Sequence, residues 1–110
     1  MGIADETPGS PVSGHGILAV FGALADPTRR RLLELLIDAR RASATSLAEG
    51  LPVSRQAVIK HLHVLEAAGL VNRVRSGREV LYLPSTDPLE ASARWLAELA
   101  ATGSIRSSDT

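Results

Sequence analysis

Residues 54–78 read SRQAVIKHLHVLEAAGLVNRVRSGR, and this stretch decides the fold. Apolar residues at positions 58, 62 and 65 recur at helical spacing, which predicts an amphipathic helix over residues 54–68. Ser54 suits the N-cap of that helix, and Gly69 suits its stop. Residues 70–75 then have the pattern of a strand, a Ser-Gly turn signal follows, and residues 79–83 form the returning strand. The stretch therefore predicts a helix followed by a two-stranded hairpin.

A short helix is predicted just before residue 54. Residues 46–49 (SLAE) fit a capping box, while Ser43 and Thr45 are alternative caps. This helix ends near Gly50, and residues 51–53 make a tight connection. Two short helices joined by a turn that contains glycine are a helix-turn-helix signature, and the hairpin adds a wing. The predicted fold class is mainly α (α+β): a winged helix-turn-helix with about five helices and a two-stranded wing.

Three further helices complete this prediction. Residues 15–25 form a helix that is apolar on nearly every side, and residues 27–39 form an amphipathic core helix that starts at Asp26-Pro27. Asp87 and Pro88 start a last helix over residues 88–102. We therefore expect one domain over residues 15–102, with flexible tails rich in small and polar residues at 1–14 and 103–110.

The first and last helices predict a dimer. A helix that is apolar all round must be buried, and a domain of this size has little core in which to bury it. The apolar stripe of residues 88–102 also lies beyond a complete winged-helix core. We expect both helices to pair with a second copy of the chain. The residues predicted at this homodimer interface are Ile17, Leu18, Val20, Phe21, Leu24, Leu89, Leu96 and Leu99.

The charge is unevenly distributed although the net charge is zero. Residues 55–78 hold five basic side chains against Glu66 alone, a local charge of +4, and the remainder carries −4. A local basic field steers binding to DNA more than the net charge does. The alternative is an ordinary solvated surface. The triplet at residues 29–31 has the same two interpretations, a solvated face or an auxiliary phosphate contact.

The exposed face of the helix at 54–68 is predicted to enter the major groove of DNA. Arg can donate two hydrogen bonds to guanine, Gln can do so to adenine, and an apolar side chain can contact thymine methyl groups. These pairings make Arg55, Gln56 and Ile59 the candidate base contacts, with partial packing as the alternative for Ile59. The candidate contacts to the DNA backbone are Ser54, Lys60, His63, Arg73, Arg75 and Arg78.

Several other functions are excluded by what the sequence lacks. There is no cysteine, so disulfides and thiolate metal sites are excluded. We find no glycine-rich phosphate loop, no cluster of metal ligands and no pair of nucleophile and base, so we expect neither an enzyme nor a cofactor or metal. With no apolar run of membrane length and no signal-peptide pattern, we expect a soluble cytoplasmic protein without a membrane partner.

Three segments together resemble one protein family. Residues 21–36 (FGALADPTRRRLLELL), 53–71 (VSRQAVIKHLHVLEAAGLV) and 76–83 (SGREVLYL) are similar to ArsR-type winged-helix repressors in order and spacing, across roughly residues 15–102. The resemblance implies a homodimeric transcriptional regulator of double-stranded DNA that is usually a repressor, with the first and last helices at the dimer interface.

This chain departs from the metal-sensing members of that family. Those members carry Cys-x-Cys in the short helix, where this chain has Ser43 and Thr45, and no histidine follows His63 to supply a site on the last helix. The resemblance is thus to a non-metal-sensing member, whose effector the sequence does not identify. Our hypothesis is a dimeric repressor that binds an inverted-repeat operator. The alternative, favoured by overall neutrality, is a protein-interaction and dimerisation module that does not read DNA.

Overall fold

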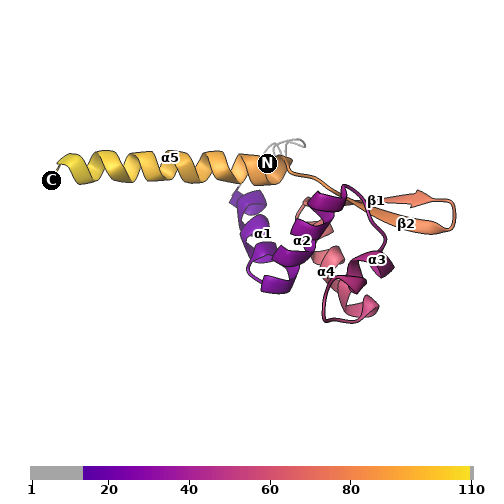
Figure 1. Cartoon of the computed structure of the whole chain (residues 1–110). Coiled ribbons are helices and arrows are strands. Elements are labelled where there is room, and N and C mark those ends of the chain that lie inside the picture. The colour runs from indigo at the N-terminus through magenta and orange to yellow at the C-terminus, as the bar shows by residue number, and fades with distance from the viewer. Residues whose placement is uncertain (1–13, 110) are drawn as a thin grey trace, which may run out of the picture.

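The computed structural model describes residues 14–109, which form five helices and one antiparallel hairpin, as predicted. In chain order these elements are α1 (Gly14–Leu24), α2 (Pro27–Ala39), α3 (Ala44–Glu49), α4 (Arg55–Ala67), β1 (Val71–Ser76), β2 (Glu79–Pro84) and α5 (Asp87–Asp109). The tail predicted at residues 1–14 lies outside the described residues, except that Gly14 begins α1. Figure 1 shows α1 to α4 as a body, from which the hairpin and α5 leave in opposite directions.

Three helices begin at side-chain caps, which explains where the chain turns. Ser54 Oγ accepts a hydrogen bond of 3.1 Å from the Ala57 amide at the start of α4. Asp26 Oδ2 accepts one of 3.0 Å from the Arg29 amide at the start of α2. This bond is the main reason why the pKa of Asp26 lies below its ordinary value of 3.8, and the positive charge of Arg29 acts in the same direction.

The cap of α3 corrects one prediction. Ser43, in an extended conformation, accepts a hydrogen bond of 3.1 Å from the Ser46 amide, so the alternative cap is the one that forms. The capping box at residues 46–49 was wrong, because Ser46 already lies within the first turn of the helix. Helix α3 therefore begins at Ala44, earlier than that box implied.

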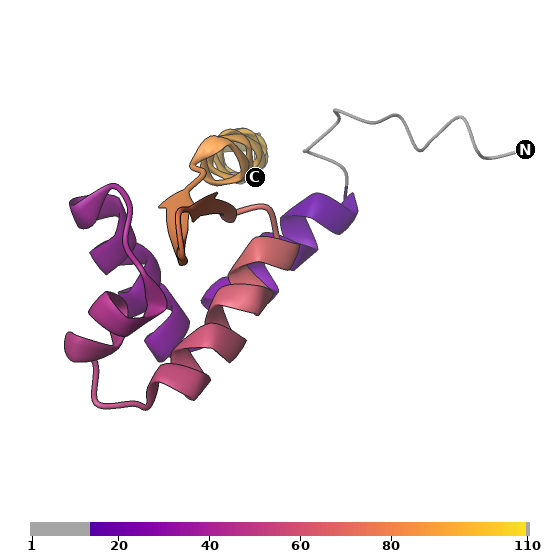
Figure 2. The same cartoon turned by 90° about the vertical axis from the view of Figure 1, so that its right-hand side faces the viewer.

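The core lies between α2, α4 and the hairpin. Leu32, Leu36, Val58, Leu62 and Leu65 are fully buried, and they meet Leu70, Val71 and Tyr82 from the hairpin side. Figure 2 shows the hairpin lying between α4 on one side and α2 and α3 on the other. The predicted inner face of α4, formed by Val58, Leu62 and Leu65, is thus confirmed, and the opposite face of the helix is left outside.

The hairpin, here called the wing, is held in register with the body. Its strands pair from Val71 opposite Pro84 to Ser76 opposite Glu79, which leaves Gly77 and Arg78 as a two-residue turn. Gly77 has φ +63°, a conformation that glycine adopts without strain. At the base of the wing, Ala42 exchanges two backbone hydrogen bonds with Tyr82, of 3.1 and 2.8 Å. The wing is therefore tied to the segment that leads into α3.

The arginine triplet has a role that neither interpretation of the sequence included. Arg29 Nε donates to the carbonyl of Ala23 at 2.7 Å, and its Nη2 donates to that of Gly22 at 3.2 Å. Arg30 Nη1 donates to the carbonyl of Leu24 at 3.1 Å. These carbonyls lie in the last turn of α1, where a cation is favourable, and the carbonyl of Gly22 also accepts from the Ala25 amide at 3.3 Å. The first two arginines therefore cap α1 from α2.

The last helix is longer than predicted. Helix α5 runs to Asp109, so its predicted end at residue 102 was wrong, and the helix continues over residues 103–109, where a tail was predicted. Gly103 disfavours a helix by only about 1 kcal/mol, and no proline follows to end it. Thr102 Oγ1 donates to the carbonyl of Glu98 at 3.0 Å inside the helix. The backbone of this segment therefore continues the helix.

Candidate nucleic-acid interface

The start of α4 presents polar side chains to solvent beside the wing. Gln56, Lys60 and His63 are exposed, as the sequence predicted for this face. Ser54 is also exposed, and because its hydroxyl accepts from the Ala57 amide, its proton remains available to an external acceptor. The first two turns of α4 are thus free to approach a ligand.

Arg55, the first residue of α4, is fixed by a contact that sequence reasoning missed. Its Nε donates a hydrogen bond of 3.1 Å to Thr45 Oγ1 on α3, although both side chains are exposed. The ten residues between the two positions hide this pairing in the sequence. Only the turn that brings α3 against α4 makes it possible, so no local pattern could have indicated it.

Ile59 is only half-buried and packs against the core. It lines a groove of about 490 Å³ between α3, the start of α4 and the wing. Other walls of this groove, here called the α3–wing groove, are Thr45, Arg55, Arg78, Val80 and Tyr82. Part of the Ile59 side chain thus packs against the core, as one of its two predicted roles required. The rest of the side chain is exposed in the groove beside Arg55.

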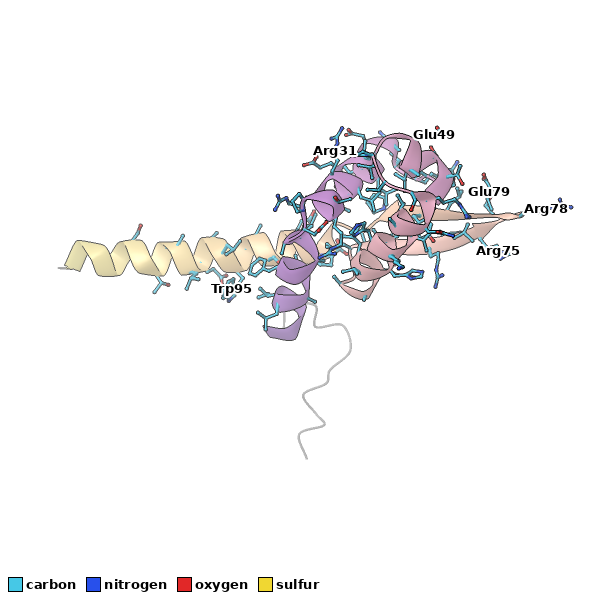
Figure 3. The ribbon with its side chains drawn as sticks, turned by 90° about the horizontal axis from the view of Figure 1, so that it is seen from below. Arg31, Glu49, Arg75, Arg78, Glu79 and Trp95 are labelled. Carbon is cyan, nitrogen blue, oxygen red and sulfur yellow. The ribbon has the colours of Figure 1, made fainter. Side chains whose placement is uncertain are left out.

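The wing carries its arginines in two different states. Arg73 and Arg75 stand opposite Tyr82 and Val80, and therefore on one face of the hairpin. Arg73 Nε lies 3.3 Å from Glu66 Oε2 on α4. Arg75, and Arg78 in the turn, have no hydrogen bond or ion pair among the described residues. Figure 3 shows both near the free end of the wing, far from Trp95 on α5.

The predicted dimer interface is only partly exposed. Ile17 and Val20 are 6% and 2% exposed, so they belong to the buried face of α1 within the chain itself and offer little surface to the predicted interface. Leu24 and Leu89 are half-buried against the core. The four remaining predicted residues are exposed, together with Trp95, which the prediction omitted. This set, here called the α1–α5 face, consists of Leu18, Phe21, Trp95, Leu96 and Leu99.

An aromatic contact joins the two helices of this face. The ring centroids of Phe21 and Trp95 lie 6.3 Å apart with the planes inclined by 53°. That geometry is typical of a favourable aromatic pair. The pair fixes α5 against α1 and still leaves both rings partly open to solvent. The α1–α5 face is therefore preformed and uncovered in the single chain.

No helix in the described part of the chain has the combination of length and apolar character that crossing a membrane requires. Among the side chains that the structure describes, there is also no group of three or more His, Cys, Asp or Glu placed to hold a metal ion.

A capped helix-turn-helix followed by a basic hairpin, on a helical scaffold, defines a winged helix-turn-helix protein. Residues 24–74 match the family model described as a helix-turn-helix domain. The chain is 34% identical over 77 residues to the transcriptional repressor SdpR of Bacillus subtilis (strain 168), covering 70% of this chain and 84% of that protein.

Two solved structures share the fold and the order of the elements. The ArsR-like transcriptional regulator from Rhodococcus sp. RHA1 is 43% identical with a TM-score of 0.79, covering 86% of this chain and 89% of that one. A crystal structure of an ArsR family transcriptional regulator is 30% identical with a TM-score of 0.74, covering 84% and 94%. This chain belongs to the ArsR-type family of winged helix-turn-helix transcriptional regulators, a DNA-binding family.

Proposed function

We propose that this protein is a homodimeric repressor that binds an inverted-repeat operator with α4 and the wing of each copy. One observation carries the proposal: Arg55 at the start of α4 and Arg78 at the tip of the wing line the same groove. A recognition helix and a wing that border one groove can contact the major groove of DNA and the adjacent backbone together. The relative SdpR is itself named a transcriptional repressor, which supports the direction of regulation.

Within this proposal the side chains divide by their chemistry. Arg55 and Gln56 read bases, and the exposed part of Ile59 contacts a thymine methyl at the edge of the same site. Cations and hydroxyls that project without bidentate geometry contact phosphates instead. This second group consists of Ser54, Lys60, His63, Arg73, Arg75 and Arg78. Arg73 is the weakest member, because binding DNA competes with its ion pair to Glu66.

The second copy is supported by the α1–α5 face. Leu18 and Leu99 are 68% and 55% exposed, and a contiguous apolar patch of this kind marks a surface for another protein. A second copy of the chain covers the α1–α5 face when the two copies are related by two-fold symmetry. Two recognition helices related in this way read half-sites about 10 bp apart, or a multiple of that, which is why the proposed operator is an inverted repeat.

The test begins with double-stranded DNA of random sequence. Sequences that the full chain retains over several rounds of selection should contain an inverted repeat, and fluorescence anisotropy should show preference over a scrambled duplex. A variant with both Arg55→Ala and Gln56→Ala should lose about 1–3 kcal/mol of that preference per base contact. Its binding to the scrambled duplex should change little, since the remaining cations still contact phosphates.

The matched control is Arg31→Ala. Arg31 is an exposed arginine of α2 that pairs with Glu34 at 3.2 Å, and Figure 3 shows it away from the wing tip. Its loss changes the net charge as Arg55→Ala does, and it should leave operator binding intact. The proposal fails if the chain prefers no sequence, or if the double variant discriminates as well as the unmodified chain. A dimer without DNA preference would favour the protein-interaction alternative.

A further inference from the structure

Thr45 offers Arg55 a fixed hydrogen-bond acceptor from a neighbouring element. Helix α3 is held on both sides of it, because Ala44 and Leu47 are buried in the core and Ser43 caps the helix. Just before α3, the residue at position 42 is bonded to the wing through two backbone hydrogen bonds. The Thr45 hydroxyl therefore occupies a position that the core determines, although its side chain lies in solvent.

The hydrogen bond restricts the part of Arg55 that matters for base contacts. Arginine normally samples many rotamers, and the 3.1 Å bond from Nε to Thr45 Oγ1 fixes the plane of the guanidinium. Within the described residues, neither terminal nitrogen of Arg55 has a partner. The four N–H donors of the two terminal nitrogens therefore remain in one plane, and a bidentate contact with O6 and N7 of guanine requires a coplanar pair of such donors.

The hydrogen bond between Arg55 and Thr45 contributes little to the stability of the fold. Both partners are exposed, and an exposed polar contact contributes little to the free energy of unfolding. Helix α3 does not need the Thr45 hydroxyl for its cap, since Ser43 supplies that cap.

We infer that Thr45 is a positioning residue for Arg55, so that a hydroxyl on α3 determines how selectively α4 reads a guanine. This inference rests on the proposed function and deepens it. Thr45 need not touch DNA. It acts by holding the guanidinium in the orientation that binding would otherwise have to select from many rotamers, and ordering such a side chain is one of the costs of association.

The experiment compares three variants on the full chain. Thr45→Val removes the hydroxyl and keeps the shape, Thr45→Ser keeps the hydroxyl, and Ser46→Ala removes a neighbouring hydroxyl. Ser46 is a matched control, because it lines the same groove while its backbone amide, rather than its hydroxyl, bonds to Ser43. Dissociation constants are measured for the selected operator, for operators substituted at each guanine, and for a scrambled duplex.

Thr45→Val should raise the dissociation constant for the operator about three- to tenfold, because the free Arg55 side chain must then be ordered on binding. The effect should be confined to one guanine position, so substituting that base should weaken binding by Thr45→Val less than it weakens binding by the unmodified chain. Scrambled DNA and the thermal midpoint should be unchanged, Thr45→Ser should restore selectivity, and Ser46→Ala should behave like the unmodified chain. In an Arg55→Ala background, Thr45→Val should have no further effect.

Three results overturn the inference and leave the proposed function standing. Thr45→Val could leave the preference for the operator intact. It could weaken operator and scrambled DNA alike, which would make Thr45 a phosphate contact. It could tighten operator binding, which would mean that Thr45 holds Arg55 away from the base. If the unmodified chain prefers no sequence at all, the proposed function and this inference both fail.

Discussion

The two ends of this molecule expose opposite kinds of surface. At one end, α4 and the wing bury most of their apolar side chains within the chain, Val64 and Val74 excepted, and expose Gln56, Lys60 and Arg78. At the other end, α1 and α5 leave leucines and two aromatic rings in solvent. Exposed cations suit a charged partner such as DNA, and an uncovered apolar patch suits another protein. Under the proposed function, DNA and a second copy of the chain therefore bind at separate places.

Helix α1, which has eleven residues, also has one buried and one exposed apolar side. Ile17 and Val20 face the core of their own chain, while Leu18 and Phe21 face outward. The apolar residues all round this helix therefore belong to two surfaces, one already buried and one still open. An apolar helix in a small domain need not be buried entirely by its partner.

The largest expected effect tests whether α4 has two independent faces. Leu62→Ala should lower the free energy of unfolding by about 2–5 kcal/mol, because Leu62 is fully buried and a cavity remains. Lys60→Ala, two residues away on the exposed face, should change it by less than about 0.5 kcal/mol. Urea unfolding followed by circular dichroism measures both. Equal losses would show that the exposed face is also structural.

The next largest effect is expected at the α1–α5 face and concerns dimerisation. Leu99→Glu should weaken dimerisation by about 1.5–3 kcal/mol for each copy, the contribution of a buried leucine. The fold should remain intact, because Leu99 is 55% exposed in the single chain. Ala101→Glu introduces the same charge on the side of α5 that carries Arg94 and Glu98, and it should leave the dimer intact. Sedimentation equilibrium distinguishes the two variants, and a monomeric unmodified chain would contradict the prediction.

Much of the polar end could be predicted because its signals are local. The spacing of Val58, Leu62 and Leu65 determines which side of α4 is buried, and the cap at Ser54 lies three residues from its donor. The Gly77 turn follows from the conformations that glycine allows. Each of these features depends on residues close together in the sequence, so a periodic pattern is sufficient to locate it.

The remaining features depend on tertiary contacts. Arg29 reaches carbonyls six and seven residues away only because α1 and α2 meet at a sharp corner. Arg55 meets Thr45 only because α3 packs beside α4. The extension of α5 beyond residue 102 was missed for another reason: glycine and serine lower helix propensity without forbidding a helix. Composition alone therefore ended the helix too early.

A smaller effect is expected from the wing arginines, of which Arg73 is paired with Glu66 and Arg78 has no ion pair among the described residues. Arg78→Ala should lower the slope of log Kobs against log salt concentration by about 1 for each phosphate that it no longer neutralises, and should weaken all sequences alike. Arg73→Ala should change the slope less, because its guanidinium is already partly neutralised by Glu66 at 3.3 Å. Anisotropy titrations at several salt concentrations measure both slopes. A larger change from Arg73→Ala would reverse the assignment of the two arginines.

The smallest effect lies at Asp26, where the corner between α1 and α2 joins the apolar end to the core. The pKa of its carboxyl is lowered mainly by the hydrogen bond from the Arg29 amide, with the charges of Arg29 and His61 acting in the same direction. Since the native pKa lies below the ordinary value of 3.8, the ionised cap stabilises the fold fully above that pH. This contribution is lost as the pH falls through the lowered native pKa.

Asp26→Asn keeps a neutral cap and cannot titrate. The thermal midpoints of the variant and the unmodified chain should therefore converge as the pH falls below about 3.8, with Asp38→Asn controlling for the loss of one carboxylate from the same helix. A gap in thermal midpoint that stays constant from neutral pH to about pH 2 would show that the charge of Asp26 contributes nothing to the corner.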